Sequence, residues 1–258
     1  MMWSQSRFPS RSLAVCAAAA LMLAGCESCP FCGGSEPANQ VTAADAARGD
    51  GAARQADSAS GSRSQDSNVI SLFDGKTLGK WKPTKFGGEG EVEVKDGQLI
   101  INYGESLSGV TWQGEPPARI NYEISLEAMR LDGNDFFVGL TVPVKQDPIS
   151  LIVGGWGGGT VGLSSLNGFD ASENETSSYH SFKSNRWYKI RLRVMEDRIQ
   201  AWIDKENVVD VDITDKKIGI RWEVELSVPL GISTFQTTAA FRNIKLTKLT
   251  PEEQEKKE

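Results

Sequence analysis

The feature that most constrains the fold of this chain is a two-residue alternation of apolar and polar side chains. Between Ile120 and Ala128 every second residue is apolar, and the residues between them are Asn, Glu, Ser and Glu. Successive side chains of a β-strand point to opposite faces of its sheet, so this pattern is typical of a strand with one buried face. No helical spacing of apolar residues competes with the alternation in this segment.

The alternation recurs in short segments separated by turn-forming residues, which predicts an all-β fold. About a dozen such strands follow one another at short spacing, as in a β-sandwich or barrel. The clearest further strand segments are Tyr188–Val194, Ile199–Ile203 and Ile218–Leu226. The turn signals between strands include Asp74-Gly75, Asp96-Gly97, Asp132-Gly133 and Glu196-Asp197.

The N-terminal residues have the order of an export signal. Arg7 and Arg11 supply positive charge, an apolar stretch from Leu13 to Ala24 follows, and small residues come next. The stretch is shorter than the roughly 20 residues that a membrane-spanning helix needs. We therefore expect residues 1–25 to be a signal peptide that is removed.

Cys26 stands where this signal ends. The sequence Leu23-Ala24-Gly25-Cys26 resembles the lipobox of bacterial lipoproteins, in which the cysteine is acylated and becomes the new N-terminus. Such acylation would anchor the protein to a membrane on the extracytoplasmic side of the cell envelope. We expect lipidation at Cys26 and no other membrane contact. The alternative is a plain secretory signal that is cleaved nearby.

The remaining cysteines also precede the folded domain. Cys29 and Cys32 have the spacing of a thioredoxin motif, but no βαβ pattern surrounds them. We therefore expect a local disulfide between them in an oxidising compartment, and redox catalysis is the alternative. Since no cysteine follows Cys32, the folded domain must be stable without a disulfide.

A polar segment separates the export signal from the alternating segments. Residues 33–67 are rich in Gly, Ser, Ala, Asp and Gln and contain almost no large apolar side chain. Such a composition cannot bury enough surface to offset the entropy lost on ordering. We expect residues 26–67 to be a flexible tether, residues 68–250 to be the folded domain, and residues 251–258 to be a charged tail.

The charge of the chain argues against a nucleic-acid partner. The formal net charge is −6, from 28 Lys and Arg against 34 Asp and Glu. The sequence contains no run rich in Lys and Arg, so it lacks the positively charged patch that is typical of a nucleic-acid-binding surface.

Both ends of the predicted domain carry motifs of a known family. Leu72–Lys82 reads LFDGKTLGKWK, which resembles the Phe-Asn/Asp-Gly-Lys-x-Leu-x-x-Trp entry of the 3-keto-disaccharide hydrolase domain family. Phe241–Leu246, FRNIKL, resembles the closing strand of that family. Tyr122–Arg130 resembles its Tyr-x-Leu-x-x-Glu-x-Arg strand, and Arg186-Trp187-Tyr188 resembles the Trp that begins its central hairpin. The motifs bracket Leu72 to Leu249.

The resemblance implies a concanavalin A-like jelly roll, a two-sheet antiparallel sandwich, that acts as a hydrolase on an oxidised glycoside. It leaves the cofactor unknown. The family's polar strand in mid-domain and its His-Gly pair have no counterpart here. The sequence instead reads Asp135–Leu140, Gly154–Gly159 and Ser172–Thr176. No catalytic residue is therefore transferred from the family.

Residues that alternate with the expected core positions would project from the outer faces of the sheets. Glu223 and Glu225 would lie two residues apart on one strand, with about 7 Å between their Cα atoms. This is within the range of separations that a glycosidase acid/base pair uses. Trp202 is a candidate platform for a sugar ring, and Arg193 and Arg221 are candidates for binding hydroxyl groups or an oxyanion. The alternative is a solvated face with cross-strand Arg–Glu pairs. The whole set is Glu123, Glu127, Trp187, Arg191, Arg193, Trp202, Arg221, Glu223 and Glu225.

A second candidate is the glycine run around Trp156. Glycines permit close backbone approach and positive φ, so the run could hold a ligand against the indole of Trp156. A tight hairpin between Ile149–Val153 and Thr160–Leu163 explains the same residues.

His180 is the only histidine of the chain and the one candidate general base of the imidazole type. The alternative is a solvated loop side chain. A single histidine excludes a His-rich metal site. Two acidic groups could bind calcium, but turn or surface roles are the alternative and we expect no metal site: Asp210 with Asp212, and Asp132 with Asn134 and Asp135.

Two functions remain open. In a 3-keto-glycoside hydrolase, Glu223, Glu225 or His180 would remove the acidic C2 proton, and Arg193 or Arg221 would stabilise the enolate. In a non-catalytic carbohydrate-binding module on the cell envelope, the aromatic rings of Trp156 or Trp202 would stack on sugar.

Overall fold

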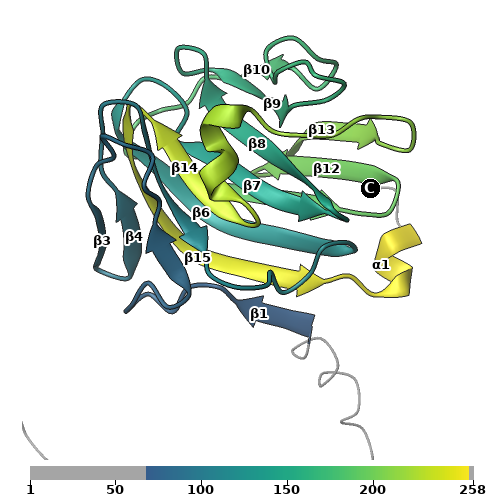
Figure 1. Cartoon of the computed structure of the whole chain (residues 1–258), viewed down its shortest axis with the longest axis horizontal. Coiled ribbons are helices and arrows are strands. Elements are labelled where there is room, and N and C mark those ends of the chain that lie inside the picture. The colour runs from purple at the N-terminus through teal and green to yellow at the C-terminus, as the bar shows by residue number, and fades with distance from the viewer. Residues whose placement is uncertain (1–67, 256–258) are drawn as a thin grey trace, which may run out of the picture. The chain divides into compact units, whose positions relative to one another are not determined.

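Two antiparallel β-sheets packed face to face form the part of the chain that the computed structural model describes, residues 68–255 (Figure 1). The predicted all-β sandwich is confirmed. In spatial order the eight-stranded sheet contains β13 (Glu206–Asp212), β12 (Arg198–Ile203), β11 (Tyr188–Val194), β6 (Tyr122–Gly133), β15 (Thr237–Lys248), β4 (Gln98–Ile101) and β3 (Val92–Lys95), and β1 (Val69–Ser71) pairs with β15. The seven-stranded sheet contains β10 (Ser178–Tyr179), β9 (Thr160–Ser164), β8 (Asp147–Gly155), β7 (Val138–Val144), β14 (Gly231–Phe235), β5 (Leu107–Trp112) and β2 (Trp81–Pro83).

The signal peptide, Cys26, the Cys29 and Cys32 pair and the tether lie outside the described residues, so these predictions stay predictions. Within residues 68–255, none of the helices combines the length and the apolar character that crossing a membrane requires.

The strands with the clearest alternation form as predicted. In β6 every second residue from Tyr122 to Arg130 is buried, because these side chains face the other sheet. β11 and β12 pair with each other across the turn at Glu196-Asp197. β3 and β4 form a hairpin across Asp96 and Gly97, whose φ angles of 51° and 76° suit a two-residue hairpin turn.

The core lies between the inner faces of the two sheets. Large side chains from both sheets meet there with almost no exposed surface, and burying each one stabilises the fold by about 1.5–3 kcal/mol. Trp81 also satisfies its only side-chain donor, because its Nε1 donates a hydrogen bond of 2.8 Å to the carbonyl oxygen of Leu72. Fully buried core side chains include Trp81, Leu99, Tyr122, Ile124, Phe137, Leu140, Leu151, Leu163 and Phe241.

The outer face of the seven-stranded sheet carries small residues, which let other segments pack closely on it. At Gly139 a Cβ atom would lie 2.5 Å from the Ser233 hydroxyl oxygen and 3.0 Å from the Phe136 ring. At Gly231 it would lie 2.6 Å from the carbonyl oxygen of Ser227. Loops and one short helix therefore cover this face directly.

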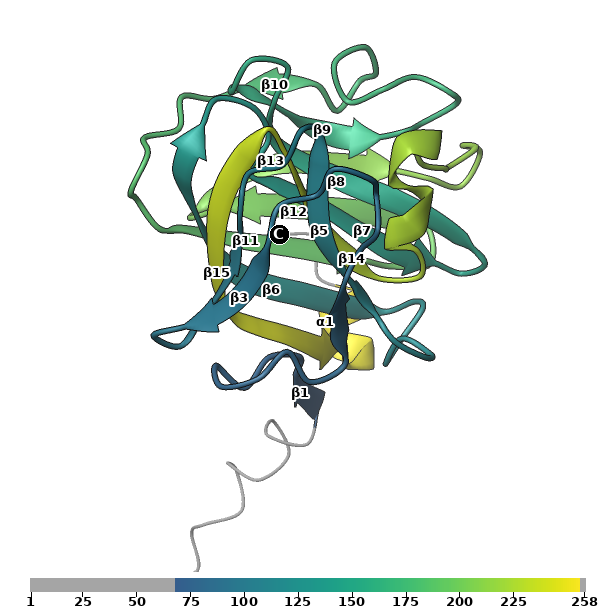
Figure 2. The same ribbon diagram turned by 60° about the vertical axis from the view of Figure 1, so that its left-hand side comes forward.

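The predicted strand Ile218–Leu226 is wrong. Its second half forms a 3-10 helix, η2 (Trp222–Ser227), which packs on β5 and β14 and lies outside their sheet (Figure 2). β14 already pairs with β5 on one side and β7 on the other, so no strand position beside it is free. In a 3-10 helix every third residue shares a face, and Val224 and Ser227 accordingly point inward.

The C-terminal residues begin with a short helix, α1 (Pro251–Glu255), where a charged tail was predicted. The backbone N–H of Thr250 donates to Glu253 at 2.9 Å, and the backbone N–H of Glu253 donates to the Thr250 hydroxyl at 3.4 Å. This reciprocal pair is a capping box, with Pro251 at the first helical position.

Candidate functional site

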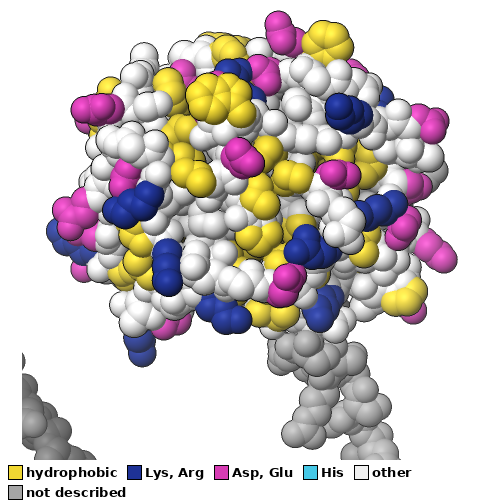
Figure 3. Space-filling view, viewed as in Figure 1, with side chains coloured by type: hydrophobic (Ala, Val, Ile, Leu, Met, Phe, Trp, Pro, Cys, Tyr) yellow, Lys and Arg dark blue, Asp and Glu magenta, His cyan; other side chains and the backbone are white. Residues whose placement is uncertain are grey.

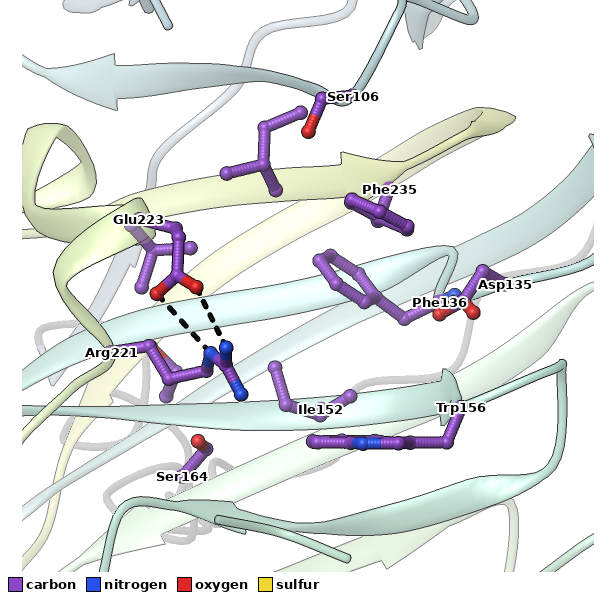
Figure 4. A pocket seen from close by; sticks show the side chains of 12 residues that line it. Ser106, Asp135, Phe136, Ile152, Trp156, Ser164, Arg221, Glu223 and Phe235 are labelled. Carbon is purple, nitrogen blue, oxygen red and sulfur yellow. Dashed lines mark hydrogen bonds and ion pairs between the residues drawn. The ribbon is translucent and has the colours of Figure 1, made fainter. Parts of the chain in front are cut away.

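A cavity of about 290 Å³ opens on the outer face of the seven-stranded sheet (Figure 4). β5, β8, β9 and β14 supply its floor, η2 supplies one wall, and the segments around Asp135 and Trp156 supply the other. Three of the predicted site residues line it together: Trp156, Arg221 and Glu223. They come from two segments that are far apart in the sequence.

Trp156 is held in place by the hairpin loop that joins β8 to β9. Its φ is 48°, and the neighbouring Gly157 and Gly158 have φ values of 85° and 109°, so the loop needs its glycines for backbone reasons. The Asp135 carboxylate accepts a hydrogen bond from the Gly157 N–H at 3.0 Å, and Arg130 donates to the Gly158 carbonyl oxygen at 3.0 Å. The glycine run is therefore a tight hairpin, and it also presents the half-exposed indole of Trp156 to the cavity.

Arg130, which binds this loop, is a buried residue of β6. Burial lowers the pKa of its guanidinium, and the nearby Asp135 charge opposes that shift. The guanidinium also lies 5.1 Å from the centre of the Phe137 ring. Such a fixed support holds the backbone of the loop that carries Trp156 in place before any ligand arrives.

At the opposite wall, a carboxylate–guanidinium–carboxylate group joins η2 to the loop after β9. Arg221 donates from Nε and Nη2 to the two oxygens of Glu223, at 3.2 and 2.7 Å, and from Nη1 to the Asp170 carboxylate. Asn174 holds the Asp170 backbone in turn, because its Nδ2 donates to the Asp170 carbonyl oxygen at 2.8 Å. Figure 4 shows the guanidinium end of Arg221 pointing toward the middle of the cavity.

These contacts set the charge of the polar wall. The Arg221 hydrogen bonds lower the pKa of Glu223, and the hydrogen bond to Glu223 raises the pKa of Arg221. Both groups are therefore charged near neutral pH. Glu223 can accept hydrogen bonds from hydroxyl groups, but a carboxylate with a lowered pKa is a weak general base.

The remaining walls are apolar. Phe136 and Phe235 stack with their ring centres 5.9 Å apart, and Ile152 lies on the floor between them and Trp156 (Figure 4). A cavity with aromatic walls and a few fixed polar groups suits a sugar ring, which has apolar C–H faces and hydroxyl groups around its edge.

Four other predicted site residues lie elsewhere. Glu225 is on η2 but is exposed and does not line the cavity. His180 lies at the end of β10, where its Nε2 is 3.1 Å from the Ser178 hydroxyl and its Nδ1 is 3.8 Å from the Glu206 carboxylate. Trp202 and Arg193 project from the eight-stranded sheet, on the other side of the sandwich.

The residues on that other side form the cross-strand pairs that were the alternative interpretation. Glu123 accepts a hydrogen bond from Arg193 Nε at 3.1 Å and one from Arg191 Nη1 at 3.3 Å. The two guanidinium groups lie 5.1 and 4.3 Å from the Trp202 ring centre, and only 5% of Trp202 is exposed. The ring faces of Trp202 are therefore occupied by arginines.

Sequence reasoning missed Asp170, Phe136, Phe235 and Ile152. Asp170 and Phe136 lie in loops without a regular spacing, so no pattern in the sequence connects either of them with Arg221. Ile152 and Phe235 alternate with core residues, but only the covering of this face by η2 and the loops makes them part of a cavity.

No metal site is visible in the part of the chain that is described: residues 68–255 contain no group of three or more His, Cys, Asp or Glu side chains that could hold an ion. The acidic residues considered from the sequence have local partners. Asp132 accepts a hydrogen bond from the Gly133 N–H at 2.8 Å, Asp212 accepts one from the Thr214 N–H at 2.8 Å, and Asp210 pairs with Arg198 at 2.5 Å.

Comparison with known proteins assigns most of the domain to one family model. The model described as "3-keto-alpha-glucoside-1,2-lyase-like domain" matches residues 68–247. No curated protein matches the chain.

Several solved structures share the sandwich at low similarity. A candidate glycosyl hydrolase from Parabacteroides distasonis has 13% identity and a TM-score of 0.48, covering 74% of this chain and 99% of its own. The carbohydrate-binding module CBM66 from Bacillus subtilis has 13% identity and a TM-score of 0.42, covering 64% and 94%. SCLam, a non-specific endo-β-1,3(4)-glucanase of family GH16, has 12% identity and a TM-score of 0.44, covering 70% and 88%. At these values the likenesses decide neither a substrate nor a chemistry for this chain.

Proposed function

The chain belongs to the 3-keto-alpha-glucoside-1,2-lyase-like domain family, and we propose that its domain acts on an oxidised glycoside, a 3-keto sugar, in the cavity between Trp156 and η2. The observation that carries this proposal is the meeting of an aromatic platform and a fixed Arg221–Glu223 ion pair in one cavity. The ring face of the sugar stacks on Trp156, and its oxygens reach the polar wall.

Arg221 is suited to the oxygen on C3. A guanidinium has more N–H donors than the three hydrogen bonds that Arg221 makes to Asp170 and Glu223. The remaining donors can bind the ketone oxygen and hold the negative charge that develops on it. Because they are fixed before the reaction, this charge stabilisation needs no reorganisation of the site.

In the reaction we propose, the C3 ketone acidifies the proton on C2. A carboxylate of the cavity accepts this proton, and the electron pair of the C–H bond forms an enolate whose oxygen faces Arg221. The enolate then expels the group on C1, so that the C1–O bond breaks and a double bond forms between C1 and C2. The departing oxygen takes up a proton, and later addition of water across the double bond completes a net hydrolysis. Glu223 is the cavity carboxylate that we assign to the proton transfer.

A second function, binding without turnover, is favoured by one specific observation. Glu223 forms two hydrogen bonds with Arg221, and these lower its pKa. A carboxylate held in this way serves better as an acceptor for sugar hydroxyl groups than as a base. The same cavity would then belong to a carbohydrate-recognition module.

One experiment separates these functions. The purified protein is incubated with 3-keto-trehalose, glucose release is followed, and binding is measured by calorimetry. Glu223→Gln should abolish release and retain binding, whereas Glu225→Gln, the same change on the exposed side of η2, should behave as the unaltered protein. Binding without release by the unaltered protein selects the recognition module. If the unaltered protein neither binds 3-keto-trehalose nor releases glucose from it, the proposed function is rejected.

We also propose that the protein is an envelope lipoprotein anchored through Cys26. The support for this is the order of charged, apolar and small residues before that cysteine. Cys26→Ser should move the protein from the membrane fraction to the soluble extracytoplasmic fraction. Unchanged membrane fractionation would contradict the proposal.

A further inference from the structure

The Asp170 carboxylate holds Arg221 from outside the cavity. Asp170 does not line the cavity, yet it accepts a hydrogen bond from Arg221 Nη1. Its side chain is 23% exposed, against 44% for Arg221. The Ser164 hydroxyl, which does line the cavity, donates to the other Asp170 oxygen at 3.3 Å. Both oxygens of the Asp170 carboxylate therefore have a defined partner.

The loop that carries Asp170, residues 165–177 between β9 and β10, is fixed from within. The buried Asn174 donates from Nδ2 to the carbonyl oxygens of Leu163 and Asp170, at 2.7 and 2.8 Å. Its Oδ1 accepts hydrogen bonds from the Thr176 N–H at 3.0 Å and from the Thr176 hydroxyl at 2.6 Å. The backbone of Asp170 is therefore tied to β9.

The same loop is joined to the segment that leads into η2. The backbones of Ser165 and Gly219 exchange two hydrogen bonds, of 2.7 and 3.1 Å. The Asn167 N–H donates to the Lys217 carbonyl oxygen at 2.7 Å, and the Lys217 N–H donates to the Asn167 side chain at 2.9 Å. Arg221 thus follows directly on a segment that the Asp170 loop holds in place.

Glu223, the other partner of Arg221, constrains the guanidinium less. It lies two residues away on the same segment, so the two side chains can move together without breaking their hydrogen bonds. Figure 3 shows acidic and basic side chains interspersed over the face that carries η2, so an ion pair between near neighbours is nothing unusual there. Asp170 differs because it relates the guanidinium to another part of the backbone.

The proposed reaction itself weakens the contact between Glu223 and Arg221. When Glu223 accepts the C2 proton it becomes a neutral carboxylic acid, and its protonated oxygen turns from an acceptor into a donor. Glu223 then keeps only part of its hold on Arg221 at the step in which the enolate charge develops. The Asp170 carboxylate takes no part in this proton transfer, so its hydrogen bond to Arg221 persists throughout.

We propose that Asp170 is a positioning residue, which keeps the Arg221 guanidinium directed at the C3 oxygen while Glu223 is protonated. This inference rests on the proposed function, since it requires both the enolate and the proton transfer to Glu223. A displacement of about 1 Å in a reacting site can lower the rate about 100-fold. The role is geometric, because the negative charge of Asp170 by itself opposes the formation of a second anion nearby.

The test is the steady-state kinetics of glucose release from 3-keto-trehalose by the purified protein. Asp170→Ala removes the acceptor for Arg221. Asp170→Asn keeps the shape, because its amide oxygen can accept from Arg221 and its amide N–H can donate to the Ser164 hydroxyl. Glu175→Gln is the matched control, since Glu175 lies in the same loop and pairs with Lys216 at 2.5 Å.

We expect Asp170→Ala to lower kcat about tenfold, the rate equivalent of one hydrogen bond to a charged group, and to leave KM within about twofold. Asp170→Asn should retain kcat within about threefold, and Glu175→Gln should match the unaltered protein. In an Arg221→Ala background, Asp170→Ala should cause no further loss, because a residue that acts through Arg221 then has nothing to position.

Circular dichroism verifies that each variant is folded. If Asp170→Ala does not fold, Asp170→Ser takes its place, because it keeps a small polar side chain that stops short of Arg221. The same kinetic expectations apply to it.

Several results would overturn the inference. If the unaltered protein releases no glucose, the proposed function fails and the inference falls with it. If it releases glucose and Asp170→Ala leaves kcat unchanged, Asp170 has no such role, while the proposed function stands. Equal losses in Asp170→Ala and Glu175→Gln would reduce the loop to a general support. Equal losses in Asp170→Ala and Asp170→Asn would assign the effect to charge, and a further loss in the Arg221→Ala background would show that Asp170 acts independently of Arg221.

Discussion

The outer faces of the two sheets carry the same residue types. They differ in whether the tryptophan rings are covered by neighbouring side chains or accessible to solvent. On the eight-stranded sheet, Trp202 lies under Arg191 and Arg193, and its faces are occupied. On the seven-stranded sheet, Trp156 and Trp222 are open to solvent. Tryptophan, arginine and glutamate in a sequence therefore do not define a binding site, because the accessibility of their ring faces and donors decides it.

The cause of the difference is the backbone that carries each group. On β11 and β12 the strand register sets Arg191 opposite Trp202, and on β6 and β11 it sets Arg193 opposite Glu123. Cross-strand neighbours this close satisfy one another. A hairpin loop and a 3-10 helix carry the groups of the other face, and neither has a neighbouring strand in register.

The largest effect that this comparison predicts is on stability. Trp202→Ala should lower the free energy of unfolding by about 3 kcal/mol, since it removes a nearly buried ring with its arginine contacts. Trp156→Ala should cost less than about 1 kcal/mol, because its ring is half exposed, but it should lose affinity for 3-keto-trehalose. Urea denaturation and calorimetric titration measure the two quantities. Loss of ligand binding in Trp202→Ala with unchanged stability would reverse the assignment of the two faces.

A somewhat smaller contrast concerns the arginines. Arg221→Ala should reduce turnover or binding of the 3-keto sugar by about 100-fold, as expected for a fixed charged donor at a developing oxyanion. Arg191→Ala, the control on the other face, should leave both unchanged because it lies across the sandwich from the cavity. Steady-state kinetics and calorimetry on both variants provide the measurement. Equal losses in the two variants would show that the cavity is not the site.

The smallest predicted effect is the pH dependence of stability. Arg221 lowers the pKa of Glu223 in the folded state from the ordinary value of 4.5. Its stabilising contribution is therefore complete above pH 4.5 and is lost as the pH falls through the lowered pKa. Because both side chains are partly exposed, the contribution should stay below about 1 kcal/mol. Glu223→Gln should flatten this part of the stability profile in denaturation measured between pH 3 and pH 7. An unchanged acid profile would contradict the role of the ion pair.

Much of the sandwich was predictable, and the site only in part. The strands around Leu126, Ile190 and Ala201 were predicted from the alternation of apolar and polar residues. This pattern can be recognised from neighbouring residues in the sequence alone. Trp156, Arg221 and Glu223 were named as candidates by residue type. Nothing in the sequence places Trp156 near Arg221, however, and the same reasoning selected Trp202, Arg193, Glu225 and His180, which lie outside the cavity.

The segment Ile218–Leu226 shows where local information ends. Its apolar residues alternate as in a strand, yet both edges of β14 are already paired, so the segment packs on the face of the sheet as η2. By itself, the sequence determined which residues face inward along most strands and where the main turns fall, because these depend on chemistry between near neighbours. Only the tertiary structure decided that η2 and the Trp156 loop line one cavity and that Asp170 binds Arg221 at its wall, because both depend on contacts between segments distant along the chain.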